Sequence, residues 1–200
     1  MEQAFEILRA AARRPLPWKN GGGVTREVAV FPAGSDLAHF DWRVSIAEVR
    51  AAGPFSRFPG VDRRMAVLEG RLTLTIEAQP ATSLTPDAPA VFFPGDVPAF
   101  GEPIDGPVVD FNVMTRRGRF ESTVTTRTLT EALELEPARG TTIALALSDL
   151  VLRYAGREVR LARLDAARLE GDGEPGDMIC MPAPASCYLI HITRVNSARL

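Results

Sequence analysis

Two polar side chains interrupt an apolar run near residue 110, and they are well placed to contact a small ligand. In residues 108–114 (VVDFNVM), Asp110 and Asn112 lie two positions apart, so an extended strand points both side chains to the same face. Buried polar groups in folded proteins are nearly always hydrogen-bonded. The pair therefore predicts either the wall of a polar pocket or an internal hydrogen-bond network, and the sequence leaves both open.

A second strand-like segment, residues 41–47 (DWRVSIA), combines a cationic and a hydroxyl side chain on one face. Arg43 and Ser45 alternate with apolar residues along this segment. On a surface strand this polar face meets solvent, whereas in a barrel with a wet interior Arg43 points at a ligand carboxylate. Arginine suits the second role because its planar guanidinium matches both carboxylate oxygens.

Residues 17–27 (PWKNGGGVTRE) contain three consecutive glycines, which permit backbone conformations closed to other residues. Successive free N–H groups there would form an anion-binding nest, with Lys19 and Arg26 adding positive charge. The alternative, which composition alone favours, is a flexible hairpin loop. The segment is not a nucleotide-binding loop, because it contains neither Gly-x-Gly-x-x-Gly nor the Gly-Lys-Ser/Thr ending of a P-loop.

A fourth segment, residues 53–63 (GPFSRFPGVDR), brackets two aromatic residues with prolines and glycines. Phe55 and Phe58 would form the walls of a pocket mouth. Alternatively, they are buried rings that pin a surface loop in place. Asp62 and Arg63 at the end of this segment either contribute to the pocket or pair with other charges.

Several chemistries are disfavoured by what the chain lacks. Its two histidines, His39 and His191, lie in opposite halves and cannot form His-x-His ligand pairs, so a histidine-held redox metal is not expected. The two cysteines, Cys180 and Cys187, provide neither a disulfide framework nor a zinc site, and we expect them to be half-buried thiols. No Gly-x-Ser-x-Gly motif is present, and neither cysteine has a base nearby in sequence. We therefore expect no metal, no cofactor and no assignable catalytic residue.

The turn residues of the chain indicate an all-β fold that positions these segments. Gly and Pro number 16 each and fall between short apolar runs, as in a sandwich or barrel. We expect strands at residues 25–31, 41–49, 64–69, 71–77, 90–93, 108–115, 122–129, 141–147, 150–155, 158–164, 177–181 and 188–195. Residues 69–71, with Gly70 at the centre, predict a tight hairpin connection. Residues 129–135 are compatible with a short helix instead, which the pattern alone does not decide.

About a dozen short strands predict one double-barrel body, because closing sheets into barrels removes exposed edges. A barrel of modest strand number can also hold one small ligand inside. The polar break at residues 116–119 (RRGR) is the best candidate for a boundary between the two halves.

The bulk composition is that of an ordinary globular protein. Of the 200 residues, 46% are hydrophobic and 24% are charged. A net charge of −2 disfavours a general affinity for nucleic acid or anionic membranes. No apolar run approaches the roughly 20 residues that span a bilayer, and the first residues lack the pattern of a signal peptide. We expect a cytoplasmic protein with no nucleic-acid or membrane partner, whereas a homo-oligomeric state is not readable from the sequence.

Taken together and in order, the four segments resemble the signature of the HutD/Ves family, with residues 68–70 (LEG) and 94–96 (PGD) between them. The resemblance covers residues 17 to about 118, and the second half is similar only in length and β-rich character. It implies an all-β bicupin, with two cupin-like β-barrels packed in one compact chain. Residues 1–118 would form the N-terminal barrel with the ligand pocket, and residues 119–200 the C-terminal barrel. The pocket implied by the resemblance draws on Asn20, Thr25, Arg26, Arg43, Ser45, Ser56, Phe58, Arg63, Asp110 and Asn112.

The family link and the arginine-rich polar faces favour a metal-free accessory or regulatory protein of histidine utilisation that binds a small carboxylate. Candidate ligands are urocanate, formiminoglutamate and formylglutamate. Arg43 and Arg63 would clamp carboxylates by charge-assisted hydrogen bonds, while Asp110 and Asn112 would read an amide, formimino or imidazole nitrogen. The alternative is a metal-free cupin enzyme, an isomerase or hydrolase acting on a histidine-degradation intermediate, with Asp110 or Glu27 as general base. A third hypothesis is a scaffold that binds a protein partner and no small molecule.

Overall fold

The computed structural model describes residues 5–18, 20–135, 139–154, 156–171, 176–180 and 184–195, and for residues 135 and 176–180 the backbone alone. Among these residues every regular element is a β-strand except one 3-10 helix, η1 (Ala10–Ala12). The prediction of an all-β chain is therefore confirmed. In the described part of the chain no helix has the length and apolar character needed to cross a membrane. Lys19 and the predicted strand ends at residues 155 and 181 lie outside the described residues, as does the side chain of Cys180.

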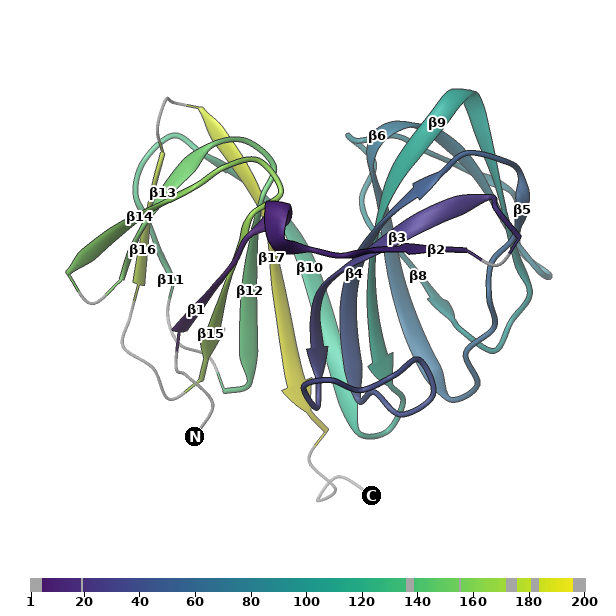
Figure 1. Ribbon diagram of the computed structural model, residues 1–200, viewed down its shortest axis with the longest axis horizontal. Helices are drawn as coiled ribbons and strands as arrows, with labels where there is room; N and C mark the ends of the chain where they lie inside the picture. Colours follow the sequence, from purple (N-terminus) through teal and green to yellow (C-terminus); the bar gives the residue numbers. More distant parts are fainter. Residues whose placement is uncertain are drawn as a thin grey trace. The chain divides into compact units, whose positions relative to one another are not determined.

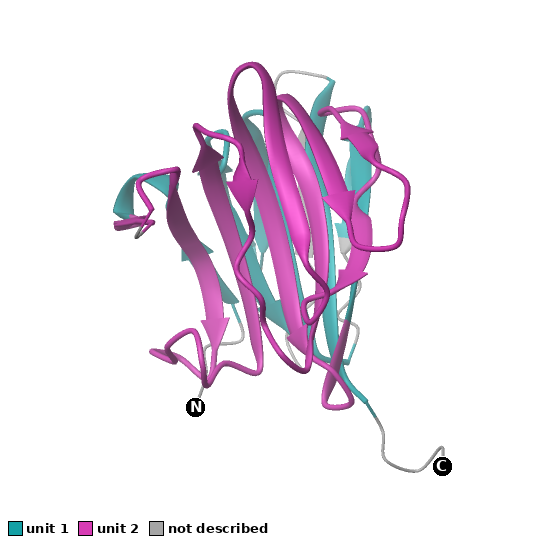
Figure 2. Cartoon of the chain, turned by 90° about the vertical axis from the view of Figure 1, so that its right-hand side faces the viewer, with its two compact units in different colours: residues 1–12, 122–200 teal, residues 13–121 magenta. Residues whose placement is uncertain are grey.

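The chain forms two compact units, which Figure 2 draws in magenta and teal. Unit 2 comprises residues 13–121, and unit 1 comprises residues 1–12 together with residues 122–200. Within unit 1, β1 (Phe5–Leu8) pairs antiparallel with β15 (Ala166–Glu170). This division differs from the predicted one at 118/119, because the N-terminal strand joins the second half and the boundary lies at 121/122. The difference arises because a strand pattern does not identify the distant strand with which it pairs.

Unit 2 is built on one eight-stranded sheet (Figure 1). Its strands are β2 (Pro15–Pro17), β3 (Gly23–Phe31), β4 (Trp42–Val49), β5 (Gly53–Pro54), β6 (Val61–Ile76), β7 (Thr82–Leu84), β8 (Val91–Pro94) and β9 (Ala99–Arg116). They are hydrogen-bonded in the order β2-β3-β4-β9-β6-β7, while β5 pairs with β9 and β8 pairs with β6. The long β9 therefore lies between β4 and β6, so strands from three parts of the sequence form the middle of the sheet.

An apolar cluster covers one face of this sheet. Met65 and Val67 of β6 point to the same face of the sheet and pack with Val108 of β9, Leu72 and Phe93. Met65 and Phe93 are fully buried, and burial of a side chain of this kind contributes roughly 1.5–3 kcal/mol. The cluster holds β6 and β9 in place, and these strands also carry polar residues on the same face.

The predicted hairpin at residues 69–71 is wrong, because β6 continues through Gly70 and pairs with β9 on both sides of it. The register shifts twice around Gly70, which marks a β-bulge or irregularity. Gly70 has a φ of +80°, and a Cβ there would lie 2.9 Å from the carbonyl oxygen of Pro107. A glycine inside a strand pattern signals either a turn or a bulge. At Gly70 the chain forms a bulge and not a turn, because β6 pairs with β9 on both sides of this residue.

Unit 1 contains a five-stranded sheet with the order β1-β15-β12-β17-β10 and a four-stranded sheet with the order β11-β16-β13-β14. The remaining strands are β10 (Phe120–Leu129), β11 (Leu133–Leu135), β12 (Thr141–Ala146), β13 (Leu150–Tyr154), β14 (Arg157–Leu161), β16 (Gly176–Cys180) and β17 (Ala185–Arg194). The short helix considered for residues 129–135 is not formed, since β10 ends at Leu129 and β11 is a strand.

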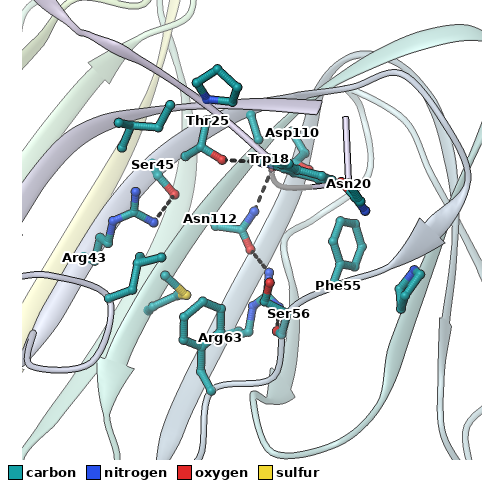
Figure 3. A pocket seen from close by; sticks show the side chains of 17 residues that line it. Trp18, Asn20, Thr25, Arg43, Ser45, Phe55, Ser56, Arg63, Asp110 and Asn112 are labelled. Atoms are coloured by element: carbon teal, nitrogen blue, oxygen red, sulfur yellow. Dashed lines mark hydrogen bonds between the residues drawn. The ribbon is translucent and has the colours of Figure 1, made fainter. Parts of the chain in front are cut away.

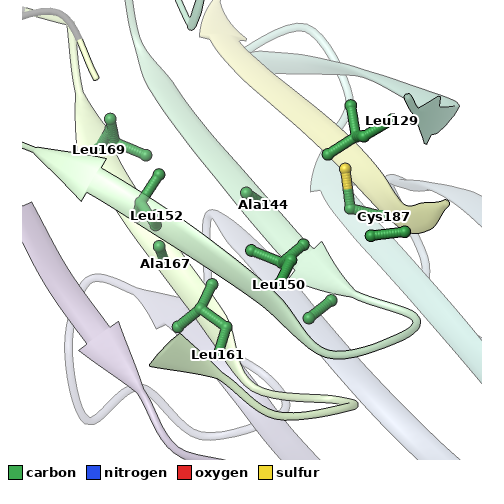
Figure 4. Packing of buried hydrophobic residues seen from close by; sticks show 10 residues of the cluster. Leu129, Ala144, Leu150, Leu152, Leu161, Ala167, Leu169 and Cys187 are labelled. Carbon is green, nitrogen blue, oxygen red and sulfur yellow. The ribbon is translucent and has the colours of Figure 1, made fainter. Parts of the chain in front are cut away.

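The two sheets of unit 1 share one apolar core (Figure 4). Leu150 and Leu152 come from β13 of the four-stranded sheet, whereas Leu169 of β15 and Cys187 of β17 come from the five-stranded sheet. Cys187 has no exposed surface, so it is more deeply buried than expected. The second half of the chain therefore has a core of its own, separate from the cluster in unit 2.

Candidate ligand-binding site

A cavity of about 600 Å³ lies within unit 2 (Figure 3). The predicted site residues that line it are Asn20, Thr25, Arg43, Ser45, Ser56, Phe58, Arg63, Asp110 and Asn112. They come from β3, β4, β6 and β9 and from the loops after β2 and β5. The structure thus brings nine of the ten predicted residues to one place. Their binding of a ligand stays a prediction.

The register of the three middle strands explains why these side chains meet. β9 pairs with β4 on one side and with β6 on the other, so residues 109–115 of β9 each have a partner on both strands. Three residues paired across β4, β9 and β6 form one rung of the sheet. Alternate residues of a strand point to the same face, so the side chains of every second rung point toward the cavity. Read from β4 through β9 to β6, these rungs are Arg43–Met114–Arg63, Ser45–Asn112–Met65 and Ala47–Asp110–Val67.

Arg63 is a buried cation held by neutral hydrogen-bond acceptors and aromatic rings. It is 5% exposed. Its Nη2 donates to Asn112 Oδ1 over 2.7 Å, and its Nη1 makes a longer contact of 3.5 Å to the carbonyl oxygen of Ser56. The guanidinium carbon lies 4.9–5.8 Å from the ring centroids of Phe93, Phe55 and Phe58. At these distances the aromatic quadrupoles attract the cation.

Asn112 and Asp110 extend this hydrogen-bonded chain away from Arg63. Asn112 Nδ2 donates to Asp110 Oδ1 over 2.8 Å (Figure 3). Asp110 has no exposed surface, and its Oδ2 has no hydrogen-bond partner. Burial raises the pKa of Asp110 to about 7, against the opposing effects of the Arg63 charge and the Asn112 hydrogen bond. Burial lowers the pKa of Arg63 to about 10, so Arg63 is cationic at neutral pH while Asp110 titrates close to neutrality.

Arg43 differs from Arg63 because it has a direct counter-ion. Its Nε donates to Glu27 Oε2 over 2.8 Å, and its Nη1 lies 3.5 Å from Ser45 Oγ. Glu27 is opposite Ser45 in the pairing of β3 with β4, which places it on the cavity face. Arg63 has no such ion pair among the described residues, so it is the cavity cation whose charge is not directly balanced.

Two aromatic side chains pack edge to face beside the cavity. The ring centroids of Trp18 and Phe55 lie 6.3 Å apart with an interplanar angle of 78°. Trp18 Nε1 donates to Thr25 Oγ1 over 2.8 Å, so Thr25 holds the indole in place. A Cβ at Gly101 would lie only 2.7 Å from the ring of Phe55. A glycine on β9 therefore makes the space that Phe55 occupies.

The consecutive glycines belong to a hairpin loop and do not form the anion nest that was considered. The Gly21 N–H donates to the Trp18 carbonyl oxygen over 3.0 Å, and the Gly22 N–H donates to Asn20 Oδ1 over 3.0 Å. These amides are therefore used within the loop. A Cβ at Gly23 would lie 3.1 Å from the indole of Trp18, so this glycine lets the tryptophan approach the backbone.

Arg26 is the predicted site residue that does not line the cavity. In the pairing of β3 with β4 it lies opposite Ile46, whereas its neighbour Thr25 lies opposite Ala47 on the cavity face. Successive residues of a strand point to opposite faces. Arg26 therefore faces away from the cavity, which differs from the prediction for this residue.

Several lining residues were not in the predicted set. Ala47 and Met114 continue the alternation of their strands, so a period of two was a usable signal for them. Leu16, Trp18 and Leu37 also line the cavity, but they come from an edge strand and from loops. Trp18 belongs to the segment 17–27 that was already predicted to contribute Asn20 and Thr25, whereas no feature of the sequence indicates that Leu16 or Leu37 approaches the middle strands.

No group of three His, Cys, Asp or Glu side chains among the described residues is arranged to hold a metal ion. His39 is exposed and contacts Asp36 at 2.7 Å. His191 lies in unit 1, and its Nδ1 is 3.2 Å from Thr142 Oγ1. Neither histidine lines the cavity, and the absence of a metal stays a prediction.

A model of the HutD family matches residues 10–181 of the chain. The chain belongs to the HutD family. A relative from Pseudomonas putida, described as an uncharacterised 21.2 kDa protein in the hutC 3' region, is 35% identical over 173 residues, covering 85% of this chain and 89% of that protein. Protein Ves from Cronobacter sakazakii is 38% identical over 109 residues, covering 54% of this chain and 58% of that protein. The predicted resemblance is confirmed.

Solved structures extend the comparison to the fold. HutD from Pseudomonas fluorescens SBW25 matches with a TM-score of 0.81 and 27% identity over 96% of this chain and 100% of that chain. A conserved protein of unknown function from Pseudomonas aeruginosa PAO1 matches over the same shares with a TM-score of 0.86 and 28% identity. A cupin 2 conserved barrel domain protein from Leptotrichia buccalis has a TM-score of 0.61 at 10% identity over 93% of this chain and 100% of that chain. This last likeness concerns the fold alone.

Proposed function

We propose that this HutD-family chain is a metal-free accessory or regulatory protein of histidine utilisation, which binds a small carboxylate in the cavity of unit 2 and acts in the cytoplasm. The observation that carries the proposal is Arg63, which is 5% exposed, lines the cavity and has no ion pair with a described residue. A charge removed from water is unfavourable unless it is paired. A ligand carboxylate beside Arg63 supplies the missing anion.

The hydrogen-bond donors of Arg63 suit such a ligand. Its Nε has no hydrogen-bond partner, and the 3.5 Å contact of Nη1 to Ser56 is at the long limit of a hydrogen bond. Charge-assisted bonds from arginine to a carboxylate are roughly twice as strong as bonds between neutral groups. The three phenylalanine rings around Arg63 keep water away, and electrostatic attraction is stronger in such an environment.

Candidate ligands are urocanate, formiminoglutamate and formylglutamate. The histidine pathway is suggested by relatives, since the Pseudomonas fluorescens protein is called HutD and the Pseudomonas putida protein is described by its position beside hutC. Each candidate combines a carboxylate with a second polar group. The cavity of about 600 Å³ lies in the usual range for small-molecule sites. The Cα atoms of Arg43 and Arg63 are separated by β9 and so lie roughly 10 Å apart, which offers partners to both ends of the ligand.

Thermal unfolding in the presence of these three compounds tests the proposal. A ligand at 100 times its Kd adds about 2.7 kcal/mol of stability, which raises the Tm of a chain of this size by roughly 5–10 °C. Arg63→Met keeps an unbranched apolar stem and removes the guanidinium, and we expect it to weaken binding roughly 10- to 150-fold. Arg63→Lys retains a cation and serves as a second variant if Arg63→Met does not fold.

The matched control for Arg63 is the next residue of β6. Arg64 points to the other face of the sheet, where its guanidinium lies 5.1 Å from the ring centroid of Phe92. Arg64→Met should therefore leave ligand binding unchanged. Equal losses in Arg63→Met and Arg64→Met, or no Tm shift with any of the three compounds, would contradict the proposal.

We also propose that each unit is a cupin-like barrel, which makes the chain a bicupin. The likeness to a cupin barrel protein over 93% of the chain supports this. So does the strand number of unit 2, because a sheet of eight strands is large enough to enclose one small ligand. A crystal structure in which the outer strands of unit 2 curl toward each other around the cavity would support the barrel, and a flat open sheet would contradict it.

A metal-free isomerase or hydrolase acting on the same compounds is the second candidate. One observation favours it, since the pKa of Asp110 is raised by burial to about 7, which suits a general acid or base at neutral pH. Turnover of urocanate, formiminoglutamate or formylglutamate by the wild type would establish an enzyme if Asp110→Asn abolished that turnover. A scaffold that binds only a protein partner is less well supported, because a cavity with both polar and apolar lining residues lies inside unit 2.

A further inference from the structure

The hydrogen bonds from Arg63 to Asp110 have a fixed direction. A guanidinium can only donate, so the atom of Asn112 that faces Arg63 Nη2 at 2.7 Å is the amide oxygen. The amide nitrogen of Asn112 then faces Asp110 Oδ1 and donates to it over 2.8 Å. Oδ1 is therefore an acceptor, and a proton bound by Asp110 has to sit on the other oxygen, Oδ2.

Oδ2 is the free end of this chain of hydrogen bonds. It is buried and has no hydrogen-bond partner, and Asp110 lines the cavity. In the sheet, Asp110 lies between Ala47 of β4 and Val67 of β6, neither of which has a polar side chain. A buried carboxylate oxygen without a donor is unfavourable, whereas a protonated Oδ2 becomes a donor that a ligand can satisfy.

The other charged groups on this face are few and mostly balanced. Arg63 of β6 is linked to Asp110 only through Asn112, and Arg43 of β4 forms an ion pair with Glu27 of β3 at 2.8 Å. Among the described residues that line the cavity, Arg43, Arg63 and Asp110 carry ionisable side chains. The protonation of Asp110 therefore depends mainly on its burial and on the charge of Arg63.

We infer that Asp110 binds the ligand as a carboxylic acid, donating from Oδ2 to an oxygen acceptor of the ligand, so that the anion and one proton are taken up together. This inference rests on the carboxylate-binding function proposed above. An anion beside Arg63 offsets the positive charge that favours the ionised form of Asp110. Proton uptake then balances the negative charge that the ligand brings into a buried site.

The inference defines the chemical class of the ligand more closely. Its second polar group should present an acceptor, such as a formyl or carboxyl oxygen, to Asp110. A cationic N–H group, such as a formimino group, would instead favour an ionised Asp110. The expectation from the sequence that Asp110 and Asn112 read a nitrogen is therefore replaced by recognition of an oxygen.

Titration calorimetry with N-formyl-L-glutamate tests proton uptake directly. Both carboxyl groups of this probe are ionised above pH 6, so the probe itself does not titrate between pH 6 and 9. Measurements at pH 8 in phosphate and in Tris, which differ in ionisation enthalpy, should reveal uptake approaching one proton per ligand. Affinity should fall about tenfold per pH unit above pH 7, or about a hundredfold by pH 9.

Two variants separate Asp110 from other causes of pH dependence. Asp110→Asn places an uncharged donor at the position of Oδ2, so its affinity should not vary with pH and should exceed that of the wild type at pH 9. Asp62→Asn is the control, because Asp62 pairs with Arg117 at 2.7 Å and does not line the cavity. Asp62→Asn should keep the pH dependence of the wild type.

The outcomes distinguish this inference from the proposed function. Binding by the wild type without proton uptake, or binding lost in a folded Asp110→Asn at every pH, overturns the inference while carboxylate binding stands. A preference for formiminoglutamate over N-formyl-L-glutamate at pH 8 also overturns it. No heat and no Tm shift with any of the three candidate compounds overturns both the proposed function and the inference.

Discussion

Replacing Asp110 by asparagine should stabilise unit 2 at alkaline pH far more than at acidic pH, even without a ligand. Asp110 has no exposed surface, and Asn112 separates it from Arg63. Burial is therefore the dominant effect and raises the pKa of Asp110 to about 7. Asparagine has the same shape and carries no charge at any pH, so it removes the penalty of a buried carboxylate.

The magnitude follows from the difference in pKa between the unfolded and folded states. The pKa of Asp110 rises from 3.8 to about 7 on folding, and each unit corresponds to about 1.4 kcal/mol, so the full effect is on the order of 4 kcal/mol. Because the folded state binds the proton more tightly, wild-type stability falls as pH rises from 3.8 toward 7 and then becomes level. Between pH 5 and pH 8, the wild type should lose about 3 kcal/mol that Asp110→Asn does not lose.

Urea-induced unfolding followed by tryptophan fluorescence measures this effect in unit 2. The chain has two tryptophans, Trp18 and Trp42, and both lie in unit 2 with Asp110. The free energy of unfolding would be compared at pH 5 and pH 8 for the wild type, Asp110→Asn and Glu77→Gln. Glu77 is exposed and follows the end of β6, so its variant controls for the loss of a surface charge. If Asp110→Asn differs from the wild type by the same amount at both pH values, the pKa of Asp110 is not raised and the reasoning is refuted.

Two further predictions concern the wall of the cavity and the other unit. Gly101→Ala should raise the Kd of the ligand, because its Cβ would lie 2.7 Å from the Phe55 ring and displace that ring toward the cavity. An unchanged Kd would contradict this prediction. Asp165→Ala should destabilise unit 1 by roughly 1–3 kcal/mol, because the carboxylate accepts hydrogen bonds from the backbone N–H groups of Ala10 and Ala162. Circular dichroism melting curves would measure the second effect, and a Tm equal to that of the wild type would argue against it.

Local alternation along the sequence was sufficient to identify which polar side chains share a strand face. Arg43 with Ser45, and Asp110 with Asn112, were each paired by a period of two, and both pairs line the same cavity. The turn residues likewise predicted an all-β chain, and the ordered motifs predicted the HutD family. These features are local, because they depend on spacing within one strand or on the identity of turn residues.

The sequence was less informative about the face on which Arg26 lies and about the conformation of the chain at Gly70. Arg26 belongs to the same motif as Thr25, yet it is the next residue along β3 and therefore lies on the opposite face. Gly70 had the pattern of a hairpin, and only the continuous pairing of β6 with β9 revealed a bulge. The first error arises because a motif match does not distinguish the two faces of a strand, and the second because a short segment does not specify the strand with which it will pair.

The sequence by itself determined the strand-rich character, the family and the two polar strand faces. The tertiary structure decided that β9 lies between β4 and β6, which places Asp110 in contact with Asn112 and Asn112 in contact with Arg63. It also decided that Arg43 has a counter-ion in Glu27 while Arg63 has none among the described residues. Strand pairing and burial are properties of the whole unit, and charge balance and pKa depend on both. The chemical difference between two arginines of one cavity was therefore decided by the fold.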